Sequence, residues 1–270
     1  MSAYGVTRAE GVDKTEEVAV RILEMAESRE VKVIDTAPAY GEAEEVIGRH
    51  GREFTVHTKL AKGVGAIESM RRSMKVLNRP KIDLLYLHDV DQLNVRPRET
   101  IAELEQCLDE GAERVGVSVY DIESVEEILS YGVVGAIQLP LNPLDRRFVD
   151  VLPRIHDAGC ACIARSIFLQ GVLLEDPKNL RPEVSHLGDQ VREFRRLCEK
   201  EGVTALEGCL AWTRAQVLLE GSIIGVQTSY ELAEIMDAWT RVSQIDLDID
   251  RLGSIAMVEN DAVDPRRWRR

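Results

Sequence analysis

The feature that most constrains the fold is a regular alternation of short apolar runs with longer segments of helical periodicity. Short apolar runs bounded by turn residues are typical of buried strands, and apolar residues recurring about every three to four positions are typical of amphipathic helices. The alternation predicts strands at 31–35, 54–59, 82–88, 114–118, 135–139, 160–165 and 222–225. It predicts helices at 13–28, 42–50, 66–77, 97–110, 122–130, 146–158, 188–200, 204–220 and 229–239.

The residues at the strand ends indicate how the sheet is organised. Strand–helix units with short connections imply a parallel sheet, either doubly wound or closed into a (β/α)8 barrel. A doubly wound sheet binds its ligand at one switch point and needs no polar residue on every strand. Six successive strands here end at or near a polar residue and the seventh ends at a glycine: Asp35, Lys59, His88, Ser118, Gln138, Arg165 and Gly225. We therefore expect a (β/α)8 TIM barrel with these residues around one mouth.

The predicted barrel lacks its first strand. Seven strands are predicted, whereas a (β/α)8 barrel has one more. The absent strand should precede the helix at 13–28, and residues 1–12 are too short and polar to supply it. Without it, the strands ending in Asp35 and Gly225 would each have an open edge. Either the chain start is late, or the barrel is incomplete or closed by another segment.

Composition predicts one domain and excludes several classes of partner. The 270 residues are 44% apolar and 30% charged, which suits a single barrel domain over 1–270 with a weakly patterned C-terminal tail at 241–270. The basic cluster at 266–270 is interpreted as solvated. A net charge of −13 argues against nucleic acids and anionic membranes. Small molecules remain as partners, and nothing indicates the oligomeric state.

Location and metal binding follow from what the sequence does not contain. It has no apolar run near the roughly 18 to 20 residues of a membrane span and no secretion signal, so we expect a cytoplasmic protein. The five cysteines are odd in number and scattered, which predicts buried free thiols rather than disulfides. Cys160 and Cys162 share one strand face, but no second Cys/His pair completes a zinc site, so no metal is expected.

Four side chains at the predicted mouth suit proton transfer. Asp35, Lys59 and His88 end three consecutive strands, and neighbouring strands lie only about 4.8 Å apart. Tyr40 follows Asp35 by five residues on a short loop. A phenol has an ordinary pKa of about 10, which an adjacent ammonium lowers. We expect Lys59 to act on the pKa of Tyr40 in this way, with Asp35 holding Lys59 in place.

This arrangement favours reduction of a carbonyl group. Tyr40 would donate the proton, and the His88 imidazole would orient the substrate oxygen. No side chain supplies a hydride, so a nicotinamide cofactor is implied. A single Asp or Lys at a strand end more often forms an ion pair or a cap, and a single His more often acts as a hydrogen-bond donor, than either acts in catalysis. Their joint occurrence on adjacent strands favours a catalytic site.

The motifs, taken in order, resemble the aldo-keto reductase family. The matching segments are Asp35-Thr-Ala-Pro-Ala-Tyr40-Gly41 with Glu44 and Ile47-Gly48, Thr58-Lys59, Asp83-Leu-Leu-Tyr-Leu-His88, Val115-Gly-Val-Ser118, Ile137-Gln138 with Asn142, Arg165-Ser-Ile-Phe-Leu-Gln170-Gly171 and Ile223-Ile-Gly225. The resemblance covers about residues 4–239. It implies a (β/α)8 barrel and NAD(P)H-dependent reduction of an aldehyde, ketone or sugar carbonyl to the alcohol. The catalytic tetrad it implies falls on Asp35, Tyr40, Lys59 and His88.

The resemblance also implies a cofactor site along the later strands. Ser118, Gln138 and Asn142 would hold the nicotinamide carboxamide or its surroundings, and Arg165 would lie near the nicotinamide. The loop at 166–171 would lie along the pyrophosphate, as barrels often bind phosphate near their last two strands. The residues of this loop assigned to cofactor binding are Ser166, Phe168, Gln170 and Gly171.

The segment after the last predicted strand bears on which cofactor is used. Many family members bind the 2′-phosphate of NADPH here through Arg or Lys, but residues 221–240 contain neither. The helix N-terminus offers free N–H groups to an anion, whereas Glu231 would repel a dianion. Thr228 and Glu231 also form a capping-box pattern. We expect weak discrimination in favour of NADPH, or a preference for NADH. The cofactor-binding residues assigned to this segment are Gly225, Gln227, Thr228 and Glu231.

Two other functions are compatible with the same residues. One is a non-catalytic cofactor-binding or regulatory barrel protein that keeps the fold and the tetrad. The other is a sugar epimerase or lyase that uses transient oxidation without net consumption of cofactor. The loops at 89–96 and 174–186 are of mixed polar composition, which suits a polar, sugar-like substrate but does not identify the physiological one.

Overall fold

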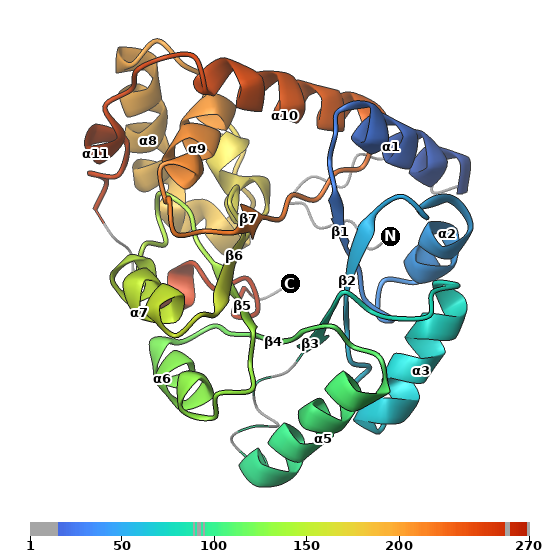
Figure 1. Cartoon of the computed structure of the whole chain (residues 1–270). Coiled ribbons are helices and arrows are strands. Elements are labelled where there is room, and N and C mark those ends of the chain that lie inside the picture. Colours follow the sequence, from blue (N-terminus) through green and yellow to red (C-terminus); the bar gives the residue numbers. More distant parts are fainter. Residues whose placement is uncertain (1–15, 89, 91–92, 94, 257–259, 269–270) are drawn as a thin grey trace. The chain divides into compact units, whose positions relative to one another are not determined.

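The structure is a computed structural model that describes residues 16–88, 90, 93, 95–256 and 260–268 (Figure 1). Each predicted strand is found in this part of the chain, within a few residues of its expected bounds. The strands are β1 (Val33–Asp35), β2 (Thr55–Lys59), β3 (Leu84–Leu87), β4 (Val115–Ser118), β5 (Ala136–Pro140), β6 (Ala161–Arg165) and β7 (Gly221–Ser222). They form one sheet in the order β1-β2-β3-β4-β5-β6-β7, which is also their order in the chain.

Helices occupy most of the connections between these strands. The pairs from β1 to β5 are parallel, and parallel neighbours need a crossover connection such as a helix. The α-helices are α1 (Glu16–Ser28), α2 (Ala43–His50), α3 (Ala66–Val76), α5 (Pro97–Glu110), α6 (Ile122–Ser130), α7 (Leu152–Asp157), α8 (Gly188–Lys200), α9 (Ala205–Arg214), α10 (Ser229–Val242) and α11 (Ile249–Leu252). The 3-10 helices are η1 (Val149–Val151), η2 (Leu169–Leu174), η3 (Pro182–Leu187) and η4 (Asn260–Ala262).

The described chain divides into two compact units. The first contains residues 16–139, apart from the undescribed positions, together with 153–163. The second contains residues 140–152 and the described part of 164–268. Strands β1 to β4 belong to the first unit and β7 to the second, while β5 and β6 contribute residues to both.

The core of the first unit is built on β3 and its neighbours. Both faces of β3 are buried, as expected for a parallel sheet covered by helices. The buried leucines on these faces are Leu84, Leu85 and Leu87. Each such leucine contributes about 1.5 to 3 kcal/mol through burial. Tyr86 is also fully buried and is paired with Gly116 on β4. A Cβ atom at Gly116 would lie 2.7 Å from the Tyr86 ring, so the tyrosine requires glycine at this position.

Helix packing dominates the second unit. Helix α9 begins with a capping box, in which Thr204 and Glu207 bond reciprocally to each other's backbone N–H groups. Helices α8 and α10 both pack against α9. A Cβ atom at Gly208 would collide with the sulfur of Cys198, so the glycine allows α8 and α9 to approach closely.

The C-terminal segment has its described basic residues in solvent, as predicted, because Arg266 and Arg267 are both exposed. Its described part, 260–268, contains the buried residues Val263 and Asp264. The Arg266 guanidinium binds both carboxylate oxygens of Asp264, and the Trp268 indole N–H donates to the carbonyl oxygen of Ala262 at 2.9 Å. Charge composition alone predicts solvation, but a carboxylate two residues before the first arginine provides a partner. Positions 269–270 lie outside the described residues.

Several predicted boundaries are wrong. The helix predicted at 146–158 is split into η1 and the short α7, because Pro153 has no N–H group and is tolerated only in the first turn of a helix. The predicted loop at 174–186 contains most of η3. Strand β7 ends at Ser222, three residues before the glycine expected to close it, and α9 ends at Arg214 rather than near 220. Nothing in the structure explains the early end of α9.

Other predictions cannot be compared with the structure. The missing first strand and the start of the first helix fall on residues 1–15, outside the described residues. Part of the loop at 89–96 is outside them as well. Among the helices that are described, none has both the length and the apolar character needed to cross a membrane.

Candidate functional site

In the first unit, Lys59 contacts two of the other residues predicted for catalysis, Asp35 and Tyr40. Asp35 and Lys59 are the last residues of β1 and β2. The Lys59 ammonium donates hydrogen bonds to Asp35 Oδ1 and, at 3.0 Å, to the carbonyl oxygen of Thr36. Only 3% of the Lys59 side chain and 8% of the Asp35 side chain are exposed. A buried ammonium is costly unless it is paired, so the carboxylate and the carbonyl hold Lys59 at this point.

Tyr40 joins this pair from the loop between β1 and α2. Its backbone N–H donates to the carbonyl oxygen of Ala37 at 2.9 Å, and the chain then turns at Gly41, whose φ of 63° favours glycine. The turn leaves the Tyr40 ring beside Lys59, with the ammonium 5.2 Å from the ring centroid. The same ammonium is 5.9 Å from the Tyr86 ring. Lys59 is therefore close to two aromatic rings as well as a carboxylate.

His88 lies at the carboxyl end of the neighbouring strand. It directly follows β3, and the strand register pairs Lys59 with Tyr86, two residues before His88. Alternate residues of an extended chain point to the same face, so the imidazole continues the Tyr86 face. His88 is partly exposed, whereas Lys59 is buried. This places a solvent-accessible imidazole one strand away from the Lys59–Tyr40 contact.

Ser118 and Gln138 are the next polar strand-end residues. They are register partners on β4 and β5, and both are buried. The Gln138 amide donates a hydrogen bond to Asp35 Oδ2 at 3.0 Å. A hydroxyl next to a carboxamide offers both a donor and an acceptor, the pair that a bound carboxamide requires. The predicted nicotinamide residues in this unit therefore fit such a group. The bond from Gln138 to Asp35 was not predictable, because it depends on the tertiary arrangement of the strands.

Five of the predicted cofactor residues of the second unit, Arg165, Ser166, Phe168, Gln170 and Gly171, lie on or directly before one strained loop. The loop follows Arg165, the last residue of β6, and has left-handed backbone at three non-glycine residues: Ser166 (φ 58°), Leu169 (φ 48°) and Gln170 (φ 53°). Such residues cost about 1 to 3 kcal/mol each and are concentrated at functional sites. Gly171, with φ 88°, completes the turn, while Phe168 precedes η2.

Asn142 holds this loop in place. It is fully buried, and its side-chain N–H donates to the carbonyl oxygen of Ser166 at 3.1 Å. Its Oδ1 accepts the backbone N–H groups of Leu144 and Asp145, both at 3.0 Å. Through these hydrogen bonds, Asn142 anchors the loop.

A buried ion pair that the sequence did not predict lies beside Asn142. Both carboxylate oxygens of Asp145 accept hydrogen bonds of 2.8 Å from the Arg147 guanidinium. Burial raises the pKa of Asp145, although the charges of Arg147 and Arg165 act in the opposite direction. The pair is formed by residues two apart in a loop, a spacing without a regular sequence signature.

The segment after β7 forms the predicted helix cap with one difference. The Thr228 hydroxyl accepts the backbone N–H of Glu231 at 3.1 Å. The Glu231 carboxylate does not return to the N–H of Thr228, as a capping box would require, but accepts the N–H of Gln227 at 2.7 Å. A carboxylate thus already binds one backbone donor at the start of α10. Gly225, which lies two residues before Gln227, is exposed.

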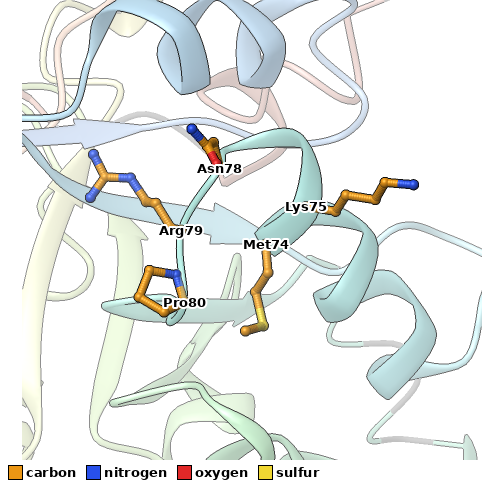
Figure 2. A pocket seen from close by; sticks show the side chains of 5 residues that line it. All are labelled: Met74, Lys75, Asn78, Arg79 and Pro80. Atoms are coloured by element: carbon orange, nitrogen blue, oxygen red, sulfur yellow. The ribbon is translucent and has the colours of Figure 1, made fainter.

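A separate surface hollow lies away from these residues. Figure 2 shows the side chains that line it, which come from the end of α3 and the turn after it: Met74, Lys75, Asn78, Arg79 and Pro80. This turn leads into the amino end of β3, whereas His88 follows its carboxyl end. The Arg79 guanidinium donates to the carbonyl oxygen of Gly51 at 2.6 Å, which gives it a structural contact. None of the predicted site residues lines the hollow.

The cysteines agree with the prediction of buried free thiols. All five are free and buried. Burial raises the pKa of Cys107 to about 11 and those of Cys162 and Cys198 to about 12, so these thiols are uncharged at neutral pH. In the ranges that the structure describes, no group of three or more His, Cys, Asp or Glu side chains could hold a metal ion.

Comparisons with known proteins identify the family and the fold class of this chain. The model of the aldo/keto reductase family matches residues 3–256. Aldo-keto reductase YhdN of Bacillus subtilis is 24% identical to this chain, over 97% of it and 89% of the relative. A putative voltage-gated potassium channel subunit beta of Schizosaccharomyces pombe is 24% identical over 77% of this chain and 75% of its own length. The holo form of aldo-keto reductase AKR11C1 from Bacillus halodurans covers 92% of this chain and 91% of its own, with 21% identity and a TM-score of 0.72. That structural likeness confirms the predicted (β/α)8 fold class.

Proposed function

The chain belongs to the aldo/keto reductase family, and we propose that it reduces an aldehyde, ketone or sugar carbonyl to the alcohol with NADPH or NADH. Family membership supports the coarser statement that the protein is an oxidoreductase acting on carbonyl compounds. The contact of Lys59 with both Asp35 and Tyr40 is the observation that carries the finer proposal. It supports Tyr40 as the proton donor.

The physical role of Lys59 is to favour the tyrosinate that remains after Tyr40 gives up its proton. At a separation of about 5 Å and an effective dielectric constant of about 20, a unit positive charge stabilises a negative one by about 3 kcal/mol. Asp35 offsets part of this stabilisation but also holds Lys59 in place. Tyr40, which is partly exposed, can reach a substrate oxygen, and His88 would donate a hydrogen bond to the same oxygen.

The buried polar groups of the first unit support the proposed binding of the nicotinamide. Ser118 and Gln138 would hold the nicotinamide carboxamide through one donor and one acceptor. When bound, the nicotinamide supplies the hydride that no side chain can provide. In the second unit, Arg165 and the strained 166–171 loop would hold the rest of the dinucleotide, and Asn142 would keep that loop in its left-handed conformation. Phe168, Gln170 and Gly171 are the further residues proposed in this loop.

The contacts at the start of α10 support weak discrimination in favour of NADPH, or a preference for NADH. The Glu231 carboxylate accepts the Gln227 N–H, a donor that an anion at the helix N-terminus would otherwise use. A 2′-phosphate would have to displace this carboxylate and would also be repelled by it. Gly225 and Thr228 complete the segment proposed to lie near this part of the cofactor. A kcat/KM at least a hundredfold higher with NADPH than with NADH would contradict the preference.

A panel of carbonyl compounds tests the proposed activity. Purified protein is incubated with NADH or NADPH and a series of aldehydes, ketones and sugars, while nicotinamide absorbance and alcohol product are both measured. We expect one equivalent of alcohol for each equivalent of cofactor oxidised. Product formed without net cofactor consumption would indicate transient oxidation and would contradict simple reduction.

A non-catalytic regulatory role is a second candidate, because one relative is a putative channel subunit. It predicts cofactor binding without turnover. Cofactor binding measured by nicotinamide fluorescence, together with no oxidation by any compound of the panel, would favour this candidate over the reductase.

A further inference from the structure

We propose that Glu44 and Thr58 are positioning residues, which together hold the Tyr40 loop in register with Lys59. The proposal rests on the reductase function proposed above. Neither residue would touch the substrate or the cofactor. Their role would be exerted through the backbone on either side of Tyr40.

The contact between the two residues is buried. Glu44 is the second residue of α2, and 6% of it is exposed, while Thr58 on β2 is completely buried. The Thr58 hydroxyl donates to Glu44 Oε1 at 2.7 Å. Glutamate is rarely buried without a partner, and Glu44 has no ion pair in the part of the chain that the structure describes. The hydroxyl of Thr58 is therefore what holds this carboxyl against β2.

The position of Thr58 next to Lys59 links this contact to the predicted active site. Neighbouring residues of a strand point to opposite faces, so Lys59 reaches the side of Asp35 while Thr58 reaches α2. Lys59 binds the carbonyl oxygen of Thr36, at the start of the Tyr40 loop. Thr58 binds Glu44, just after the end of that loop. Two consecutive residues of β2 thus fix the chain four residues before Tyr40 and four residues after it.

Among the described residues, the backbone hydrogen bonds made by Tyr40 and Glu42 at the end of the loop, at 3.3 and 3.1 Å, are longer than the Glu44–Thr58 bond. The residue before α2, Glu42, makes no side-chain cap hydrogen bond, so the helix start is not held by a cap. Within the loop, the backbone bond from Ala43 to the Tyr40 carbonyl oxygen is long, at 3.3 Å. Loss of the Glu44–Thr58 bond would free this end to shift. A misplacement of about 1 Å of a catalytic group can lower a rate by about a hundredfold.

The test uses substitutions that remove the bond from either side. Thr58→Val removes the hydroxyl at nearly constant shape, and Glu44→Leu removes the acceptor. Thr58→Ser and Glu44→Gln keep a donor and an acceptor, respectively. Thr204→Val is the matched control, because it also removes a hydrogen-bonded threonine hydroxyl but at the cap of α9. It should lower the melting temperature with no change in kcat.

We expect Thr58→Val and Glu44→Leu each to lower kcat by about 10-fold to 100-fold while leaving the KM for the cofactor unchanged. Thr58→Ser and Glu44→Gln should recover most of the lost kcat. The double variant Thr58→Val/Glu44→Leu should be no slower than the slower single variant, because both changes remove one shared contact. If both disrupting variants fold and retain the kcat of the unchanged protein, the proposal is overturned.

A second measurement does not depend on turnover. The ultraviolet absorbance of tyrosinate is titrated in each protein and in the same protein carrying Tyr40→Phe, so that the difference reports Tyr40. Lys59, whose ammonium lies 5.2 Å from the Tyr40 ring centroid, is unchanged in every variant, as are Asp35 and His88. We expect Tyr40 to ionise at higher pH in Thr58→Val than in the unchanged protein, because it has moved away from Lys59. Thr204→Val should leave the titration unaltered.

The two measurements separate the positioning role from the proposed function. A shifted titration in a protein that reduces no carbonyl would leave the positioning role standing and remove the reductase. An active reductase whose Tyr40 titration and kcat are both unaffected by Thr58→Val and by Glu44→Leu would remove the positioning role alone. If one disrupting variant does not fold, the other applies the same test from the opposite side of the bond.

Discussion

The Gln138 side-chain amide donates a hydrogen bond to Asp35 Oδ2 at 3.0 Å, although 103 positions separate the two residues in the chain. The other carboxylate oxygen, Oδ1, accepts the Lys59 ammonium. Both oxygens of Asp35 are therefore occupied, by groups from two different strands. This fixes the orientation of the carboxylate and, through it, the position of Lys59.

Asp35→Asn should destabilise the protein by about 3 to 5 kcal/mol, because it leaves the buried Lys59 ammonium without its counter-charge. The free energy of unfolding is measured by denaturant titration near neutral pH. Gln138→Ala serves as the comparison and should cost about 1 to 3 kcal/mol, since it removes one hydrogen bond to a charged group. Equal losses for the two variants would show that the charge of Asp35 is not what matters.

Asn142→Ala should weaken dinucleotide binding more than it slows the chemical step. The substitution removes the anchor of a loop that holds left-handed backbone at Ser166, and the loop would relax to a less strained form. We expect the Kd for the cofactor to rise by about 10-fold to 100-fold, comparable to the loss of one or two hydrogen bonds. Nicotinamide fluorescence measures the Kd. An unchanged Kd in a folded Asn142→Ala protein would argue that the loop does not contact the cofactor.

Local sequence patterns predict much of this fold, because each strand and its polar end are close together in the chain. Asp35, Lys59, Ser118 and Arg165 are the last residues of their strands, as the apolar runs predicted. Pro97 begins α5 for the same local reason, since proline is favoured at a helix start. Where a boundary depends on a competing local effect, as at Pro153, periodicity alone predicts a helix that is too long.

Contacts between distant segments could not be predicted from the sequence. The residue types of the tetrad were recognisable, but the bond from Gln138 to Asp35 and the burial of Glu44 depend on how strands and helices pack. The left-handed backbone at Ser166, Leu169 and Gln170 has no sequence signal, because none of these residues is glycine. The pairing of Arg266 with Asp264 could not be predicted from composition, which gives the charges but not their partners.

Asp264 should make the stability of the C-terminal segment depend on pH. Burial alone would raise the pKa of Asp264, but hydrogen bonds from Arg266 and the charges of Arg266 and Arg147 outweigh it and lower this pKa below its ordinary value. A lowered pKa means that the ionised carboxylate stabilises the folded state above the ordinary aspartate pKa of about 3.9. The contribution is lost as the pH falls through the lowered pKa.

Asp264→Asn should therefore reduce the free energy of unfolding at neutral pH by about 1 kcal/mol, a modest value because Arg266 is half exposed and solvent screens the pair. Urea titrations at a series of pH values measure the difference between the two proteins. The difference should shrink as the pH is lowered below about 4. A difference that stays constant over the whole series would mean that the carboxylate charge is not responsible.

The central claim is that Tyr40, held beside Lys59, gives the proton to a reduced carbonyl. Tyr40→Phe keeps the ring next to the ammonium and removes only the hydroxyl. The most direct measurement compares kcat and cofactor Kd for this variant and the unchanged protein, with a carbonyl compound that the unchanged protein reduces. We predict that kcat falls by about 10²-fold to 10⁴-fold, the usual contribution of a general acid, while the Kd for the cofactor does not change. A Tyr40→Phe protein that keeps the kcat of the unchanged protein would contradict the claim.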